Sequence, residues 1–326
     1  HFVDIEGVTG SIPVSPTIKS QADMTSSKSP PSSRISSVSR APQIPASADL
    51  PYSTMAEMFT WLADEGVDLT GDPLNLEDQE LGRQYAICLV PRSGSTFLAH
   101  LLKNTGRFGF PNEWMAVALA EGEARETGSP DWDTLFRRVM ARYASDNGVS
   151  GIELALAHLT WGRQATGRPD ILDPGWTYFY LRRRNIVRQA ISMHVAHQSG
   201  VLHSFQMTDD ARKVRDAVLY DTPAIRSWIK FLQDEELKWE REFGRMGIEP
   251  IRLYYEDITA RPERAVRLFS NVLGLPETPT IKTSTIERIG TSRTDDWEAR
   301  YRDEDAQYLS ALPLHRPFVH TPVSMS

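Results

Sequence analysis

Short apolar runs alternate with longer amphipathic stretches along the chain from about residue 84 onward. Three of these runs are typical of buried strands: "YAICLV" at 85–90, "WTYFYL" at 176–181 and "PIRLYYED" at 250–257. A further strand-like piece precedes His158. Continuous apolar runs of this length are expected of strands whose two faces are both covered.

The stretches between the runs have the apolar spacing of helices. "STFLAHLLKNTG" predicts a helix ending near Gly106, and "NIVRQAISMHVAHQ" predicts one that begins after the N-cap Asn185. "TPAIRSWIKFLQDEELKWEREFGRMG" predicts a long helix ending near Gly244 or Gly247, and "RPERAVRLFSNVLGLP" one closed by Gly274. Strands that alternate with helices predict an α/β fold, with a parallel sheet flanked by helices on both faces.

The two ends of the chain differ in composition from this regular part. Residues 1–50 hold twelve Ser and six Pro, which predicts a disordered leader. Residues 51–83 are expected to form a helical, acidic segment that leads into the domain, with seven carboxylates and no basic residue between 62 and 80. We therefore expect the principal domain at 84–305 and a C-terminal tail at 306–326.

Composition narrows the classes of function. The 326 residues are 40% hydrophobic with a net charge of −7, so a general nucleic-acid-binding surface is not expected. No apolar stretch approaches the roughly 20 residues of a membrane helix, and no signal-peptide pattern is visible. The single cysteine, Cys88, fits a reducing compartment, and no metal-binding spacing is found among the eight His.

The loop after the first run, "VPRSGSTFL", has the layout of a phosphate-binding turn between a strand and a helix. Ser93, Gly94, Ser95 and Thr96 would present backbone N–H groups at the helix N-terminus, and Arg92 would add a permanent positive charge. The G-x-x-x-x-G-K-[ST] signature of nucleotide triphosphate sites is absent. The alternative is an ordinary strand–helix turn with small polar residues.

A second basic group follows the second run. Arg182, Arg183 and Arg184 stand at the end of the strand predicted at 176–181, and Ser192 lies in the next helix. Because ligands collect at the carboxyl ends of parallel strands, these residues predict a second phosphate site near the first. The alternative is a solvated basic turn.

Four segments resemble a known family in order and spacing. They are "PRSGSTFLAHLLKNTGRFGFPNEW" (91–114), "LRRRNIVRQAISMHVAHQSGV" (181–201), "YYEDITARPERAVRLFSNVLGLP" (254–276) and "SRTDDWEARYR" (292–302). With them the chain resembles the sulfotransferases that use 3′-phosphoadenosine 5′-phosphosulfate (PAPS), and most closely the bacterial branch like trehalose 2-sulfotransferase. The resemblance implies a P-loop-like fold related to the P-loop NTPases.

The resemblance also implies roles for the two basic groups. Arg92 and the following loop would grip the 5′-phosphosulfate, without a metal. Ser192 and either Arg183 or Arg184 would hold the 3′-phosphate, because the family offers both spacings. Arg293 of "SRTDDW" is a further 3′-phosphate candidate, and the alternative for it is a surface Arg beside Trp297.

The resemblance places the general base at Glu113 of "GFPNEW". A neutral alcohol is a poor nucleophile, and a carboxylate can remove its proton as the new bond forms. His158 and His194 are reserve candidates for the base. The chain has Glu153 where the resemblance implies a Lys, and this reversal of charge raises the question of which alcohol is accepted, or whether activity is retained.

The expected function is therefore transfer of a sulfuryl group from PAPS to a hydroxyl of a carbohydrate or glycolipid. The alternatives are a nucleotide-binding protein of the same fold without catalysis, and a P-loop kinase. Trp114, Trp132 and Trp161 could stack on sugar rings, although core packing is the commoner role. The donor implies a cytoplasmic location in bacteria, and the family includes homodimers.

Overall fold

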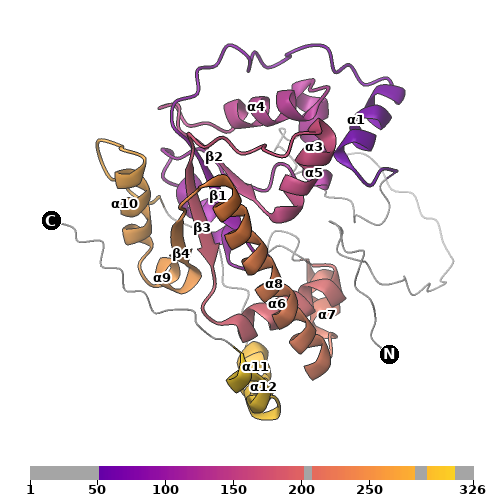
Figure 1. Ribbon diagram of the computed structural model, residues 1–326, viewed down its shortest axis with the longest axis vertical. Coiled ribbons are helices and arrows are strands. Elements are labelled where there is room, and N and C mark those ends of the chain that lie inside the picture. Colours follow the sequence, from indigo (N-terminus) through magenta and orange to yellow (C-terminus); the bar gives the residue numbers. More distant parts are fainter. Residues whose placement is uncertain (1–50, 202–207, 283–291, 313–326) are drawn as a thin grey trace, which may run out of the picture.

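The computed structural model describes residues 51–201, 208–282 and 292–312 (Figure 1). The leader predicted at 1–50 and most of the predicted tail lie outside the described residues. Over the described part, no helix combines the length and the apolar character that crossing a membrane requires.

A parallel sheet of four strands forms the centre of the molecule, in the order β2-β1-β3-β4. The strands are β1 (Gln84–Leu89), β2 (Ser150–Leu154), β3 (Thr177–Arg182) and β4 (Ile251–Tyr254). The predicted α/β fold with a parallel sheet is confirmed. The strand predicted at 250–257 is shorter than expected, because Tyr255 already begins a helix whose first turn carries two carboxylates, Glu256 and Asp257.

Helices connect and cover the strands. In the described residues they are α1 (Met55–Asp64), α2 (Ser95–Lys103), α3 (Val117–Thr127), α4 (Trp132–Arg142), α5 (Leu156–Thr166), α6 (Ile186–Ser199), α7 (Asp209–Asp216), α8 (Thr222–Met246), α9 (Tyr255–Ala260), α10 (Pro262–Val272), α11 (Ser292–Glu304) and α12 (Ala306–Ala311). The helices predicted from the apolar spacing correspond to α2, α6, α8 and α10.

Both faces of the sheet are buried, as the continuous apolar runs predicted. On one face Tyr85 and Ile87 of β1 pack with Leu98 of α2 and with residues of α10. On the other face Ala86 and Cys88 pack with residues of α1, α3, α4, α5, α6 and α8. Figure 1 shows the sheet between these helices.

The direction in which the chain adds strands to the sheet reverses between β1 and β3. From β1 the chain passes to β2 on one side, whereas from β3 it passes to β4 on the other side. The loops that leave the carboxyl ends of β1 and β3 therefore diverge, and such a point is where ligands bind in open α/β sheets. Both basic groups predicted from the sequence follow these two strands.

Candidate anion-binding and catalytic site

The β1–α2 loop (residues 90–94) has an unusual backbone. Arg92 adopts a left-handed φ of 65°, which is uncommon for a residue other than glycine. Gly94 has a φ of 93°, and a Cβ there would lie 2.1 Å from Cδ2 of Tyr255. The loop therefore requires glycine at this position, because the aromatic ring at the end of β4 packs directly on its backbone.

The loop leaves polar groups open at the N-terminus of α2. This helix begins at Ser95 without a side-chain cap, so no capping side chain accepts a hydrogen bond from its first N–H groups. The Ser93 side chain is fully buried, and its Oγ has no hydrogen-bond partner among the described residues. Open N–H groups and an unpartnered hydroxyl in one short loop fit the oxygens of a bound phosphate or sulfate.

The two groups of residues that were predicted to bind phosphate contact each other. Arg92 Nε donates to Ser192 Oγ on α6 over 3.0 Å, and Arg183 Nη1 donates to the carbonyl oxygen of Arg92 over 3.4 Å. Gln189 Nε2 donates to the carbonyl oxygen of Pro91 over 2.8 Å. The loops after β1 and β3 and the first turns of α6 therefore form one connected basic site.

Arg183 and Arg184 are neighbours in sequence but have different surroundings. The Arg184 guanidinium makes two hydrogen bonds with Asp257, of 2.7 and 2.6 Å, and lies 4.2 Å from the ring centroid of Tyr254. Arg183 lies 4.9 Å from the ring centroid of Tyr255, the residue that packs on Gly94. The geometry thus brings Arg183 to the β1–α2 loop and ties Arg184 to α9.

Glu256 orients this pair of arginines. Its carboxylate accepts the backbone N–H of Arg184 and of Asn185, over 3.0 and 3.1 Å, and approaches Arg183 Nε to 4.0 Å. Asn185 in turn caps α6 by accepting the N–H of Arg188, as its sequence position predicted. The start of α6 is therefore held by both a side-chain cap and a carboxylate from α9.

Arg293 lies on α11 and reaches the C-terminal end of α7. Its guanidinium donates to the carbonyl oxygens of Arg215 and Asp216, over 2.9 and 2.7 Å, and lies 5.0 Å from the ring centroid of Trp297. Arg215 in turn is close enough to Arg92 for its positive charge to lower the pKa of that residue. A basic surface thus continues from the β1–α2 loop through α7 to α11.

Arg92 faces both positive and negative neighbours. Desolvation, together with the charges of Arg215 and Arg183, lowers its pKa to about 10, while the Glu113 carboxylate opposes this change. Arg92 remains a cation near neutral pH in either case. Several cations held together in a desolvated site are stabilised when an anion binds among them.

Glu113 lies beside this basic site, in the segment before α3. Loss of hydration raises its pKa to about 7, and the charge of Arg92 limits the rise. Its side chain is 27% exposed, and Oε2 lies 3.8 Å from His158 Nε2. A carboxylate with a pKa near neutrality is suited to accept a proton at neutral pH.

The two reserve histidines have other surroundings. His158 Nδ1 accepts the backbone N–H of Ala155 over 3.1 Å, so its neutral ring carries the proton on Nε2, toward Glu113. Burial lowers the pKa of His158 to about 4, which keeps the ring neutral. His194 Nε2 pairs with the carbonyl oxygen of Leu219 over 2.9 Å and links α6 to the segment before α8. Glu113 therefore fits the base better than either histidine does.

Glu153 is buried in the sheet, on β2, with 1% of its surface exposed. Its backbone N–H donates to the carbonyl oxygen of Asn112 over 3.0 Å, which ties the segment that carries Glu113 to the sheet. Burial raises the pKa of Glu153 well above its ordinary value, the neighbouring charge of Glu113 adds to this, and a hydrogen bond from Ser95 opposes it. The carboxyl thus lies between the proposed base and the start of α2.

Two of the three candidate tryptophans belong to the core. Trp114 stacks on Tyr143 with ring centroids 3.8 Å apart and donates Nε1–H to the carbonyl oxygen of Phe110. Trp132 is 4% exposed and packs with Phe136. Trp161 is only half-buried, and its ring lies 5.5 Å from that of His158, on the Glu113 side of the site.

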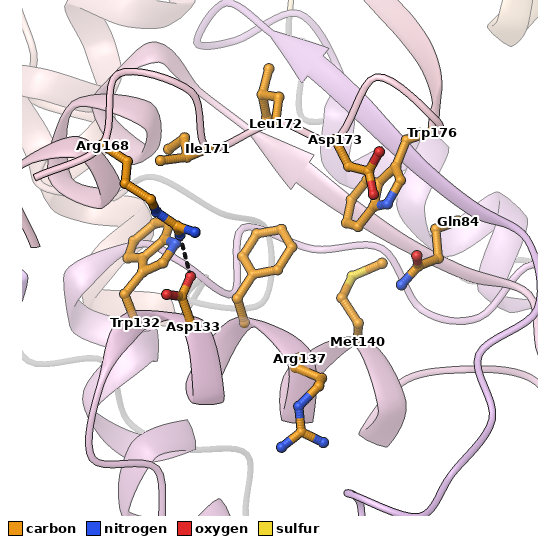
Figure 2. A pocket seen from close by; sticks show the side chains of 11 residues that line it. Gln84, Trp132, Asp133, Arg137, Met140, Arg168, Ile171, Leu172, Asp173 and Trp176 are labelled. Atoms are coloured by element: carbon orange, nitrogen blue, oxygen red, sulfur yellow. Dashed lines mark hydrogen bonds and ion pairs between the residues drawn. The ribbon is translucent and has the colours of Figure 1, made fainter. Parts of the chain in front are cut away.

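A cavity of about 270 Å³ lies at the opposite, amino edge of the sheet (Figure 2). It is bounded by Gln84 at the start of β1, Trp176 just before β3, and residues of α4. Two of its charged groups pair with each other, in the Arg168–Asp133 ion pair drawn in Figure 2. Of the candidate residues, Trp132 lines this cavity, whereas the predicted catalytic and donor-binding residues do not.

Comparisons with known proteins show the family of this chain. The family model described as Stf0 sulphotransferase matches residues 84–166 and 163–304. The chain belongs to this family. It is also similar to trehalose 2-sulfotransferase of Mycobacterium tuberculosis, with 25% identity over 68% of the chain and 95% of the relative. The trehalose 2-sulfotransferase of Mycolicibacterium smegmatis is 26% identical over 71% of the chain and 97% of the relative.

Two residues of this Stf0 chain were missed by reasoning from sequence. Tyr255 covers Gly94 and Arg183, but in the sequence it reads as the end of a strand. Arg215 contributes charge to the site, but on a helix without a buried residue it reads as a solvated basic residue. Neither residue stands out in the local sequence pattern, because α7 and α9 are brought to the site only by the tertiary fold.

Within the described residues, no group of three or more His, Cys, Asp or Glu side chains is arranged to hold a metal ion. The side chains of the candidate site are instead cationic, hydroxyl and carboxyl groups. This set resembles the one that the sequence predicted for a phosphosulfate site.

Proposed function

We propose that this member of the Stf0 sulphotransferase family transfers a sulfuryl group from PAPS to a hydroxyl of a carbohydrate. The single observation that carries the proposal is the connected basic site formed by the loops after β1 and β3 and by α6, with the Glu113 carboxylate beside it. The two curated relatives are named for sulfation of trehalose, which supports a sugar as acceptor. A cytoplasmic location and a homodimer remain predictions.

The residues of the β1–α2 loop fit the phosphosulfate end of the donor. The unpartnered Ser93 hydroxyl, the N–H groups at the start of α2 and the bare backbone at Gly94 offer hydrogen bonds and close approach to an anion. Arg92 would hold the oxygen between phosphate and sulfur and stabilise the negative charge that develops on it. When bound, the donor supplies the sulfuryl group, whose bond to the 5′-phosphate breaks as the acceptor oxygen attacks.

Arg183 and Ser192 would hold the 3′-phosphate. Arg183 is favoured over Arg184 because Asp257 already engages both ends of the Arg184 guanidinium. Arg293 is a more distant candidate, since its guanidinium contacts α7. Arg293 would act on the 3′-phosphate through Arg215, whose charge interacts with those of both Arg293 and Arg92.

Glu113 would act as the general base. In the carboxylate form it accepts the proton of the sugar hydroxyl, and Nε2 of the neutral His158 ring lies 3.8 Å from its Oε2. Because sulfuryl transfer resembles phosphoryl transfer, the protein's contribution is positioning and charge stabilisation. The half-buried Trp161 near His158 provides an apolar face against which a sugar ring can stack.

Calorimetric titration with 3′-phosphoadenosine 5′-phosphate (PAP) tests the proposal, with ADP as the control. We expect PAP to bind at least about tenfold more tightly than ADP, since charged hydrogen bonds to the 3′-phosphate are worth about 1.5–3 kcal/mol. Equal affinities would contradict it. If PAP binds, incubation with PAPS and trehalose or other sugars distinguishes an enzyme from a nucleotide-binding protein without catalysis. Preference for ATP with Mg²⁺ would favour the kinase alternative.

A further inference from the structure

Glu153 is a carboxyl group at a place where an anion is expected to bind. In the sheet register it lies beside Ile87 of β1, and side chains in register on adjacent strands point to the same face. Ile87 packs with Leu98 of α2, so Glu153 also points to the α2 side of the sheet. Ser95, the first residue of α2, hydrogen-bonds to it.

One oxygen of this carboxyl is unused. Glu153 is 1% exposed, and among the described residues its Oε1 has no hydrogen-bond partner. Ser93 Oγ, in the loop just before α2, is likewise buried and without a partner in the described part of the chain. Two unpartnered polar atoms at the start of one helix indicate a ligand that would complete their hydrogen bonds.

The charged groups around Glu153 disfavour its ionised form. Glu113 approaches it from the segment before α3, and its charge makes ionisation of Glu153 less favourable. Tyr85 on β1 also faces it and can be only neutral or negative. Among the charges of the described residues that act on Glu153, none is positive. A second negative charge here would therefore be desolvated and unbalanced.

We propose that Glu153 is a neutral carboxylic acid that donates its O–H to the anionic end of the donor at the start of α2. This role rests on the function proposed above and adds a positioning residue to it. A neutral acid is a hydrogen-bond donor as well as an acceptor, whereas a carboxylate only accepts and would repel the ligand. Ser95 and Glu153 would then hold the same group from two sides.

Infrared spectroscopy tests the protonation state without any ligand. At about pH 8, above the pKa of about 7 of Glu113, the difference spectrum between wild type and E153Q should contain the carbonyl band of a protonated carboxylic acid. Glu113→Gln is the matched control and should leave that band in place. Addition of PAP should shift the band, because its O–H gains a charged partner. Absence of the band would overturn the proposal.

Binding of PAP tests the donor role. E153Q keeps a neutral donor of the same shape and should bind within about threefold of wild type, whereas E153L should bind about tenfold or more weakly because one hydrogen bond to a charged group is lost. If E153Q bound tenfold more tightly, Glu153 would be a carboxylate, and if E153L bound like wild type, it would not be a donor. Either result would overturn the proposal while PAP binding by wild type upheld the function. A wild type that binds no PAP would instead overturn the proposed function, and the donor role with it.

Discussion

The two edges of the sheet offer an instructive comparison. The amino edge has a cavity of about 270 Å³, with aromatic rings and charged groups around it. There Phe136 stacks between Trp132 and Trp176, and Arg168 pairs with Asp133. The carboxyl edge holds buried polar atoms, at Ser93 and Glu153, that have no hydrogen-bond partner among the described residues.

The two edges thus differ in hydrogen bonding, and we place the proposed site at the edge whose buried polar atoms lack partners among the described residues. Groups that already satisfy each other gain little from a ligand, whereas a buried unpartnered hydroxyl or carboxyl gains a hydrogen bond. The variants below alter one edge at a time.

The largest effect is expected from Glu113→Gln at the carboxyl edge. The amide keeps the shape of the side chain but cannot accept the proton, so turnover should fall by about 10²–10⁴-fold. PAP affinity should change little, because the base is not a phosphate ligand, and calorimetry checks this. Glu126→Gln on α3 is the control for loss of a carboxylate, and turnover equal to wild type in E113Q would remove Glu113 from the mechanism.

Arg183→Ala and Arg184→Ala compare two neighbouring cations of equal charge. Loss of Arg183 should weaken PAP binding by about 10- to 100-fold, the worth of charge-assisted hydrogen bonds to a phosphate. Arg184→Ala should cost little affinity, because its guanidinium is engaged by Asp257. The titration should be repeated with AMP, which lacks the 3′-phosphate, and the difference should vanish there. The opposite ranking would assign the phosphate to Arg184.

The pH dependence of turnover follows from the raised pKa of Glu113. The base acts as a carboxylate, so kcat/KM should be lost as pH falls below about 7, by about tenfold per unit, and be level above it. His158 stays neutral over this range, since its pKa is about 4, and should add no second step. A pH–rate profile with its midpoint near the ordinary carboxylate value would contradict this assignment.

Gly94→Ala should distort the β1–α2 loop. The new Cβ would meet the Tyr255 ring at 2.1 Å, and the φ of 93° is strained for alanine. We expect a loss of about 1–3 kcal/mol in the free energy of unfolding and weaker PAP binding. Gly122→Ala in α3 is the matched control, because nothing lies within 4 Å of its Cβ position, and it should be neutral or stabilising by up to about 1 kcal/mol. Denaturant titration of both variants measures the difference.

Arg168→Ala at the amino edge should have the smallest effect. Its ion pair with Asp133 is largely exposed, and such pairs contribute about 0–1 kcal/mol. Turnover and PAP affinity should therefore remain within about twofold of wild type. A larger loss of turnover would mean that the amino edge takes part in the reaction, and the comparison between the edges would fail.

The sequence by itself determined the alternation of strands and helices and the two places where anions are expected. Buried strands need continuous apolar runs, and helices need apolar residues on one side, so both leave a local signal in 85–90 or in the stretch after Asn185. The short loop with Arg92 and Gly94 is equally local. The length of the last strand was less predictable, because "YYED" suits a strand as well as the start of α9.

Only the tertiary structure decided how these local pieces meet. The order β2-β1-β3-β4 brings Arg92 to Ser192 and Arg183, which are about a hundred residues away along the chain. It also separates Arg183 from its neighbour Arg184 and buries Glu153 beside the start of α2. The physical reason is that charge and hydrogen bonding depend on distance through space and on exclusion of water, and neither quantity is encoded in the spacing of residues along the chain.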